Sequence, residues 1–592
     1  MGAAVFQLRG TLPSRLLRLV VLGVALLSGV SVSPAVSDRP NVIIIMTDDQ
    51  GYGDLGLHGN PVLATPHLDR LGSQGVRLGN FYVSPVCAPT RASLLTGRYN
   101  HRTGVVDTYR GRALMAPDEV TLAEMLRSAG YRTGIFGKWH LGDNHPLRPM
   151  DQGFDESLVH RGGGIGQPSD PPGGTNYFDP VLWRNGRAVT NRGYCSDVFT
   201  DAAIDFVRRQ TSRPFFALLA FNAPHTPLIA PPAGYEKYRK QSLAHDRFPA
   251  VGQPLAGDAD EDAVARVYAM IENIDANVGR LLAVLDERGL ASNTIVIFLT
   301  DNGPQGVRYN AGLRGRKGSV FEGGIRVPCF WRWPAQLPGG VVMDRPAAHI
   351  DVVPTVLAAC RVRAPRSAVF DGRNLLPWLR NPAAAWPERT LYFQWHRGEA
   401  PQLYRAFAAR SGRFKLVQPE SVAETNWMGP PIFQLYDLAH DPYERHDVAA
   451  AHPEIVEQMR TGYEAWFRDV GRTRGFDPVR IYLGTRHENP VTLTRQDWRG
   501  TRAEWSPRGV GHWEVDVRRA GRYQVTLQFG PVAAGTTVHF DLRDVHAERT
   551  LPPGAVEATF PDLRLPRGPA RLRAWLATGG TNVGVLFVHV AR

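Results

Sequence analysis

Three short segments of the chain, 41–46, 214–221 and 294–299, are almost wholly apolar and rich in β-branched or aromatic residues. Strands that are buried on both faces of a parallel sheet have this composition, because helices cover both faces. Helical spacing of apolar residues occurs elsewhere in the chain, most clearly over 261–288, where Gly289 ends the pattern. The alternation predicts an α/β fold in which helices sandwich a mostly parallel sheet.

Polar residues follow four of the expected strands at the point where each strand ends. The fourth strand is shorter and spans residues 131–136. In chain order the polar residues are Asp48 and Asp49, Lys138 and His140, His225, and Asp301 and Asn302. Ligands of parallel α/β sheets bind beyond the carboxyl ends of the strands, so these side chains can meet along one edge of the sheet. Lys138 and His140 would project to the same side if the backbone between them stays extended.

A cysteine stands at the predicted start of a helix that continues through residues 92–95. Pro89 suits the first helical turn, where a missing N–H costs nothing. Cys87 would therefore lie near free backbone amides and the positive end of the helix dipole, where anions bind. Arg91 lies one turn further along and can return its guanidinium toward Cys87. A lone cysteine at a helix start is usually inert, so the surrounding residues must decide its role.

The string Cys-x-Pro-x-Arg, followed by Leu-Leu-Thr-Gly at residues 94–97, resembles the signature of type I sulfatases. Together with later motifs in the same order, the resemblance extends over residues 39–470. It implies an alkaline-phosphatase-like fold and an arylsulfatase-type hydrolase, which splits sulfate esters of aryl alcohols or carbohydrates into alcohol and inorganic sulfate. It also implies that a formylglycine-generating enzyme oxidises Cys87 to formylglycine (3-oxoalanine), whose hydrate is the nucleophile.

The residues after the first and last of these strands are hard oxygen donors, which suit Ca²⁺ or Mg²⁺ rather than a soft metal. Either pair alone could merely cap a helix or a turn. The resemblance makes Asp48, Asp49, Asp301 and Asn302 the metal ligands, together with the formylglycine oxygen at Cys87. It makes Ca²⁺ the usual metal, which would polarise the sulfate and lower the pKa of the hydrated aldehyde.

The resemblance also implies roles for five basic side chains. Arg91 stabilises the hydrated aldehyde, and Lys138 contacts both the sulfate and the formylglycine. His140 is the base that breaks down the sulfated intermediate. His225 binds the sulfate and donates a proton to the leaving oxygen, while Lys317 holds the sulfate and helps to neutralise the leaving group. One hydroxyl of the hydrate attacks sulfur and the second expels sulfate, so an unmodified cysteine could not complete the cycle.

The segment 141–195 departs from this pattern. It is rich in Gly, Pro and Asp and is expected to form long loops over the site. Some sulfatases carry a hydroxyl residue in this region that assists the site. Here residues 161–166 read Arg-Gly-Gly-Gly-Ile-Gly, so we assign no equivalent residue.

Changes in composition predict four segments. Residues 1–37 are expected to be a secretory signal peptide, because basic residues precede an apolar run that ends in small residues; an uncleaved anchor is the alternative. Residues 38–388 would form the catalytic α/β domain, 389–475 a small α+β subdomain that completes it, and 476–592 an appended β-sandwich. We therefore expect export to the periplasm or the exterior, with no stable membrane insertion after cleavage.

Three tryptophans of the predicted β-sandwich leave its role open. Trp498, Trp505 and Trp513 could stack on sugar rings, which would make this domain carbohydrate-binding, or they could form its core. The four cysteines are Cys87, Cys195, Cys329 and Cys360. Modification of Cys87 would leave at most one internal disulfide, and spacing does not say which.

The partners expected are a sulfated small molecule or glycan and, during maturation, the formylglycine-generating enzyme. The formal net charge of +12 fits attraction to an anionic substrate, although a well-solvated surface would give the same excess. No arginine-rich helix or aromatic platform indicates nucleic acid. Two alternatives stay open: a phosphoester or phosphonate monoester hydrolase on the same scaffold, and a non-catalytic glycan-binding surface protein.

Overall fold

A computed structural model describes residues 1–2, 39–255, 257–420, 422 and 427–592. The predicted signal peptide lies outside the described residues, apart from Met1 and Gly2. Within the described ranges, no helix is both long enough and apolar enough to cross a bilayer.

The centre of the fold is a sheet of ten strands in the order β11-β2-β10-β9-β1-β8-β4-β5-β6-β7. The strands are β1 (Asn41–Thr47), β2 (Val76–Leu78), β4 (Arg132–Lys138), β5 (Glu156–His160), β6 (Val181–Arg184), β7 (Arg187–Thr190), β8 (Phe215–Ala220), β9 (Thr294–Thr300), β10 (Cys329–Arg332) and β11 (Val341–Met343). The consecutive strands β9, β1, β8, β4 and β5 are all parallel, which confirms the predicted sheet.

Successive side chains of each strand point to opposite sides of the sheet, so both of its faces are apolar. Helices cover both faces. Val42, Ile44 and Met46 of β1 belong to a core shared with α3, α4 and α9. Ile43 and Ile45 pack instead with α2, α5 and α7. The helices are α2 (Pro66–Gln74), α3 (Cys87–Thr96), α4 (Leu122–Ser128), α5 (Cys195–Arg208), α6 (Pro232–Tyr238), α7 (Glu261–Glu287), α8 (Glu322–Ile325), α9 (Val352–Ala359) and α10 (Leu376–Arg380). The predicted α/β sandwich is confirmed.

The expectation of loops alone over 141–195 is wrong, because this segment contains β5, β6 and β7. β5 extends the parallel sheet beside β4, and the hairpin of β6 and β7 forms its antiparallel edge. These strands are short, and β7 is mostly exposed, so they lack the apolar run that marks a buried strand. The glycine and proline residues around these strands are typical of loops, so the sequence pattern predicted loops for the whole segment.

A smaller antiparallel sheet follows, in the order β13-β14-β15-β16, and the helix α11 packs on it. At the centre of this layer the rings of Phe407 and Tyr463 stack with centroids 3.6 Å apart. This unit has the predicted α+β character. Its elements are β13 (Thr390–Gln394), β14 (Phe407–Ser411), β15 (Phe414–Gln418), β16 (Gln434–Asp437) and α11 (Pro453–Arg472); a separate two-stranded pair joins β3 (Phe81–Tyr82) to β12 (Ala347–Ala348).

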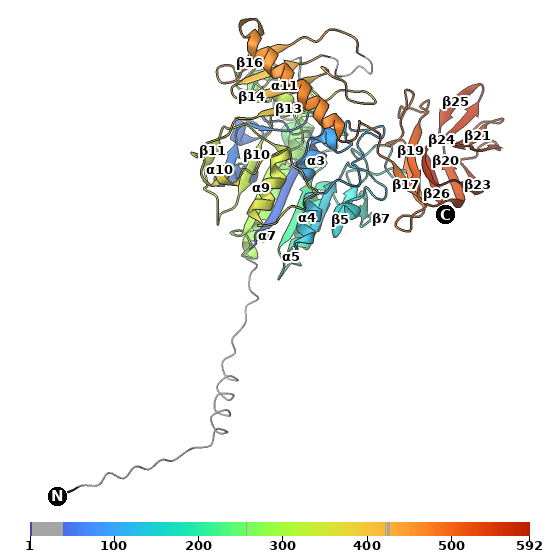
Figure 1. The fold of residues 1–592 in the computed structure, drawn as a ribbon, viewed down its shortest axis with the longest axis horizontal. Helices are drawn as coiled ribbons and strands as arrows, with labels where there is room; N and C mark the ends of the chain where they lie inside the picture. Colours follow the sequence, from blue (N-terminus) through green and yellow to red (C-terminus); the bar gives the residue numbers. More distant parts are fainter. Residues whose placement is uncertain (3–38, 256, 421, 423–426) are drawn as a thin grey trace. The chain divides into compact units, whose positions relative to one another are not determined.

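The last part of the chain is a β-sandwich of two sheets, drawn in orange to red in Figure 1. One sheet has the order β17-β19-β24-β21-β22, with β25 beside β24, and the other has the order β18-β26-β20-β23. The strands are β17 (Ile481–Leu483), β18 (Val491–Thr494), β19 (His512–Val517), β20 (Gly521–Gln528), β21 (Thr537–Leu542), β22 (Val545–Thr550), β23 (Glu557–Leu565), β24 (Gly568–Thr578), β25 (Thr581–Gly584) and β26 (Phe587–Ala591). Trp498 and Trp513 lie fully buried in its core, so the sugar-stacking alternative is wrong for both.

All four cysteines, each within the described part of the chain, are free and buried. The internal disulfide that the sequence allowed therefore does not form in this structure.

Candidate active site

The carboxyl ends of four neighbouring strands, β9, β1, β8 and β4, form one side of the site. Asp301 follows β9, Asp48 follows β1, and Lys138 is the last residue of β4. His225 lies five residues beyond the end of β8. The parallel pairing of these strands brings together residues that are up to 253 positions apart in the chain.

Cys87 is the first residue of α3, and Val86 precedes it with an extended N-cap conformation. The cysteine is 2% exposed and lines a cavity of about 810 Å³. Burial raises the pKa of the Cys87 thiol, although Lys138 and Lys317 oppose the shift. The unmodified side chain is therefore a neutral thiol, which is a poor nucleophile.

Acidic oxygens gather beside Cys87. Asp48, Cys87 and Asp301 each offer a ligand atom, and these atoms lie within 4.8 Å of one another; Asp48, Asp49 and His225 form a second such group. Oδ1 of Asp48 and Oδ1 of Asn302 are buried without a hydrogen-bond partner among the described residues. Unpaired buried oxygens are costly, and a hard divalent cation would satisfy both. The donor set therefore fits Ca²⁺ or Mg²⁺.

The charges of this cluster shift the pKa values of two of its carboxyl groups in opposite directions. Burial alone would raise the pKa of Asp48, but the ammonium of Lys138, with the basic groups around it, holds this pKa well below its usual value. Burial and the charge of Asp48 raise the pKa of Asp301 to about 7. Asp301 thus resists ionisation, because its carboxylate would be repelled by the charge of Asp48. A bound cation would reduce this repulsion.

Arg91 is 3% exposed and points inward from α3, so it is not a surface ion pair. Its Nη2 and Nε atoms lie 2.8 and 3.2 Å from Oδ2 of Asp301. Its Nη1 donates to the carbonyl oxygen of Lys138 at 2.9 Å. Lys138 in turn pairs with Asp48. Arg91 therefore links the ends of β9 and β4.

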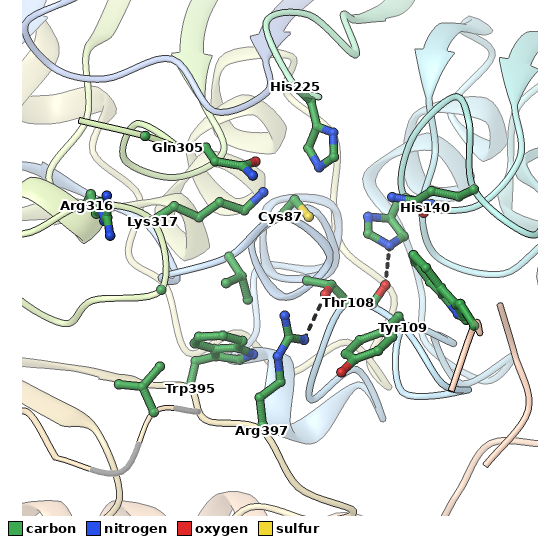
Figure 2. Close-up of a pocket in the computed structure, with 17 residues that line it drawn as sticks. Cys87, Thr108, Tyr109, His140, His225, Gln305, Arg316, Lys317, Trp395 and Arg397 are labelled. Atoms are coloured by element: carbon green, nitrogen blue, oxygen red, sulfur yellow. Dashed lines mark hydrogen bonds between the residues drawn. The ribbon is translucent and has the colours of Figure 1, made fainter. Parts of the chain in front are cut away.

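Lys317 reaches the site from the loop between β9 and α8. Its Nζ lies 2.7 Å from Oδ1 of Asp49, and Nδ2 of Asn302 donates to the same oxygen at 2.8 Å. Burial would lower the pKa of Lys317, but the carboxylate of Asp49 raises it above its usual value. Lys317 is therefore a permanent cation, and Figure 2 shows its ammonium directed toward Cys87.

The two histidines face Cys87 from the other side of the cavity (Figure 2). Nε2 of His140 lies 2.6 Å from the carbonyl oxygen of Thr108, while its buried Nδ1 has no hydrogen-bond partner within the described ranges. Nδ1 of His225 lies 2.6 Å from the carbonyl oxygen of Thr226, which leaves Nε2 toward Asp49 at 3.9 Å. Since carbonyl oxygens only accept, each ring keeps one nitrogen free to take a proton.

Both imidazoles are neutral when no ligand is bound. Burial, together with Lys138, holds the pKa of His140 well below its usual value, and burial, together with Lys317, lowers the pKa of His225. The premise of an extended backbone at His140 is wrong, because this residue has a left-handed φ of 62°. The turn allows Lys138 to pair with Asp48 while His140 faces the cavity.

The glycine run at 161–166 is part of the site. A Cβ atom at Gly163 would lie 2.6 Å from Cε1 of His140, and a Cβ at Gly164 would lie 3.3 Å from the ring of His225. The absence of side chains at these two positions therefore makes room for both imidazoles.

The sequence analysis missed most of the cavity wall. The residues involved come from loops of several sheets, and no local pattern links them. They are Thr108, Tyr109, Gln167, Gln305, Arg316, Trp395, Arg397 and Val422. Trp505, which the sequence analysis considered only as a residue of the β-sandwich, lines the same cavity. The aromatic rings and guanidinium groups of this wall suit an anionic ester with a ring-shaped leaving group.

A family model described as Sulfatase matches residues 40–362, and a second, described as N-sulphoglucosamine sulphohydrolase, C-terminal, matches residues 316–465. The chain belongs to the sulfatase family. This sulfatase is 31% identical over 541 residues to steryl-sulfatase of Mus musculus, an alignment that covers 71% of this chain and 81% of the relative. It is 31% identical over 494 residues to arylsulfatase A of Homo sapiens, with 74% and 89% covered.

Solved structures agree with this assignment. The crystal structure of Ps i-CgsB in complex with k-i-k-neocarrahexaose has a TM-score of 0.60 and 29% identity, and the match covers 72% of this sulfatase and 92% of that chain. The expected alkaline-phosphatase-like fold and the class of sulfuric ester hydrolase are confirmed. Neither matched family model reaches the β-sandwich of this sulfatase.

Proposed function

We propose that this sulfatase releases inorganic sulfate from sulfate esters with a nucleophile made from Cys87. The observation that carries the proposal is the convergence of Lys317, His140 and His225 on a buried cysteine above an acidic cluster. The neutral, buried thiol is poorly suited to attack sulfur itself. Formylglycine, installed at this position by a formylglycine-generating enzyme, supplies two hydroxyls on hydration, one to attack sulfur and one to expel sulfate.

We propose Ca²⁺ as the cation. Asp48, Asp49, Asp301 and Asn302 would hold it together with residue 87. Mg²⁺ usually retains several waters, whereas Ca²⁺ accepts a larger set of protein oxygens, which fits this crowded and buried group. When bound, the cation supplies positive charge that polarises the sulfate and lowers the pKa of a coordinated oxygen.

The chain's own basic residues would divide the remaining work. Lys317, which lines the cavity, would present its ammonium group to the sulfuryl oxygens, which gather negative charge during transfer. Lys138 is buried against Asp48, so its positive charge would act from behind the lining of the cavity. His140 has a free nitrogen at low pKa and can accept a proton when sulfate is expelled. His225 can deliver a proton to the leaving oxygen, because a bound sulfate anion favours its charged form. Arg91 holds Asp301 and the end of β4 in place.

The first 37 residues support export of the enzyme, to the periplasm or beyond the cell. Immunoblotting of cell fractions, with the predicted cleavage verified by the N-terminal sequence of the mature chain, tests this part of the proposal. A full-length chain retained in the cytoplasm would contradict it.

The test of function uses enzyme co-expressed with a formylglycine-generating enzyme. We expect release of sulfate from 4-nitrophenyl sulfate, with a kcat/KM well above that for 4-nitrophenyl phosphate, and no turnover by Cys87→Ala. Cys329→Ala is the matched control, because Cys329 is equally buried but lies in β10, away from the cavity. Activity retained by Cys87→Ala, or a preference for the phosphate ester, would contradict the proposal.

A further inference from the structure

One side chain of the β-sandwich reaches the catalytic cavity. Trp505 lies in the loop between β18 and β19 and lines the same cavity as Cys87. Its half-buried ring meets the ring of Tyr109 edge-on, with centroids 5.4 Å apart. Of the three tryptophans considered above, this one alone is not in the core. The appended domain therefore contributes a wall to the active site.

The loop that carries Trp505 is held firmly within the β-sandwich. The guanidinium of Arg495 donates to the carbonyl oxygens of Ser506 at 2.9 Å, Gly584 at 2.6 Å and Val585 at 2.9 Å. These bonds join the loop of Trp505 to the end of β25, at Gly584 and Val585. The indole is consequently placed in advance of substrate binding, which reduces the entropy lost on complex formation.

The β-sandwich is also attached to the catalytic wall. Nε2 of Gln496 donates to the carbonyl oxygen of Thr108 at 3.3 Å, the same oxygen that holds His140. The backbone N–H of Gly111 donates to Gln496, and Nη1 of Arg499 donates to the carbonyl oxygen of Gly111 at 3.1 Å. The position of Trp505 is therefore fixed relative to the reacting centre.

This tryptophan also lines a second cavity, of about 490 Å³. Trp505 and Gln167 line both cavities, so the two are neighbours. The second cavity is bounded by the 166–175 loop of the catalytic domain and by Leu586 and Phe587 of the β-sandwich. Leu586 is 40% exposed, which leaves an apolar surface at the rim.

The polar groups of the second cavity indicate what it can bind. Asp170 lines it and is 7% exposed, and its Oδ1 has no hydrogen-bond partner among the described residues, although Oδ2 accepts from the N–H of Gly166. A buried acceptor without a partner favours a ligand that donates a hydrogen bond. The cation of Arg495 is already engaged by carbonyl oxygens. This environment suits a hydroxyl-bearing, uncharged ring rather than a second sulfate group.

We propose that the two cavities are adjoining subsites for one sulfated oligosaccharide, with Trp505 between them. The sulfated sugar would occupy the cavity of Cys87, and a neighbouring unsulfated sugar would occupy the second cavity. The apolar C–H face of a sugar packs well on an indole and on Leu586, while Asp170 accepts from a hydroxyl. This inference rests on the proposed sulfatase activity and adds that the natural substrate is longer than one sugar.

The experiment compares kcat/KM for 4-nitrophenyl sulfate with kcat/KM for size-fractionated disaccharides and tetrasaccharides of carrageenan and of chondroitin sulfate. We expect at least one oligosaccharide to be desulfated more efficiently than the aryl ester. Trp505→Ala should lower kcat/KM for that oligosaccharide about tenfold more than for the aryl ester, equivalent to ~1.4 kcal/mol. Leu586→Asp should change the ratio of the two kcat/KM values in the same direction. Because Leu586 is exposed, this substitution should leave the fold intact.

Trp575→Ala is the matched control. Trp575 is a half-buried tryptophan of β24 that stacks on His539 and lines neither cavity, so both rates should stay at the wild-type value. A ratio unchanged in both Trp505→Ala and Leu586→Asp, or no oligosaccharide preferred to the aryl ester, would overturn the subsite proposal alone. Absence of sulfate release from every substrate would overturn the sulfatase proposal and this inference with it.

Discussion

Replacement of Gly163 by alanine tests whether the position of His140 matters for chemistry. The added Cβ would lie 2.6 Å from Cε1 and 2.7 Å from Nε2 of His140, both inside the 3.0 Å that Cβ atoms do not enter. The imidazole must therefore move, and the 2.6 Å contact between Nε2 and the carbonyl oxygen of Thr108 is lost. Loss of one hydrogen bond costs about 0.5–1.5 kcal/mol of stability.

The effect on turnover should be much larger than the effect on stability. A misplacement of about 1 Å in a catalytic group can cost about 100-fold in rate. We therefore expect Gly163→Ala to lower kcat for 4-nitrophenyl sulfate about 100-fold, with an unfolding free energy within about 2 kcal/mol of the wild type.

Two further glycines calibrate this experiment. A Cβ at Gly164 would meet Nε2 of Gln167 at 3.1 Å and the ring of His225 at 3.3 Å, so Gly164→Ala should be milder. Gly530 has no neighbour within 4 Å of an added Cβ, so Gly530→Ala should match the wild type. Initial rates under saturating substrate, with urea unfolding of the same preparations, provide both quantities. Wild-type kcat in Gly163→Ala would refute the role of His140.

Three other predictions follow from the buried charges. Dialysis against a chelator should lower activity more than about 100-fold and Ca²⁺ should restore it, whereas unchanged activity would contradict the ligand set. Arg91→Met removes the partner of Asp301, which can then hold a proton, and should cost the metal-free enzyme about 1–3 kcal/mol in urea unfolding; a loss under about 0.5 kcal/mol would be inconsistent with the pair. Burial raises the pKa of Asp275 to about 6, despite two opposing backbone hydrogen bonds, so its contribution to stability is complete below about pH 4 and is lost as pH rises through 6. Asp275→Asn should flatten that part of the stability curve, and superimposable curves would count against it.

Much of the fold is predictable because its strongest elements are local. The apolar runs of β1, β8 and β9 and the amphipathic pattern of α7 are each long enough to be recognised in the sequence. At these positions the residue types that favour the element are also the ones that the fold buries. The order of the polar residues also follows, since residues after parallel strands meet at one edge. Short edge strands such as β7 show no comparable apolar pattern, because their side chains face solvent and not a covering helix.

The cavity wall is not predictable in the same way. Trp395 follows β13 in the smaller sheet, and Trp505 belongs to the β-sandwich, yet both line the cavity of Cys87. Their proximity depends on how three sheets pack, which no short string encodes. The role of Gly163 and Gly164 is also not predictable from the sequence. These residues leave space for the two imidazoles, and no sequence motif marks a position where a side chain must be absent.

The central claim is that an oxidised side chain at position 87 splits the sulfate ester. The most direct measurement is the mass of the peptide that contains residue 87, taken from enzyme whose sulfatase activity has been determined in the same preparation. The account predicts that active preparations carry the aldehyde, and that activity rises in proportion to the fraction of peptide converted. Full activity in a preparation whose peptide carries only the free thiol would contradict it.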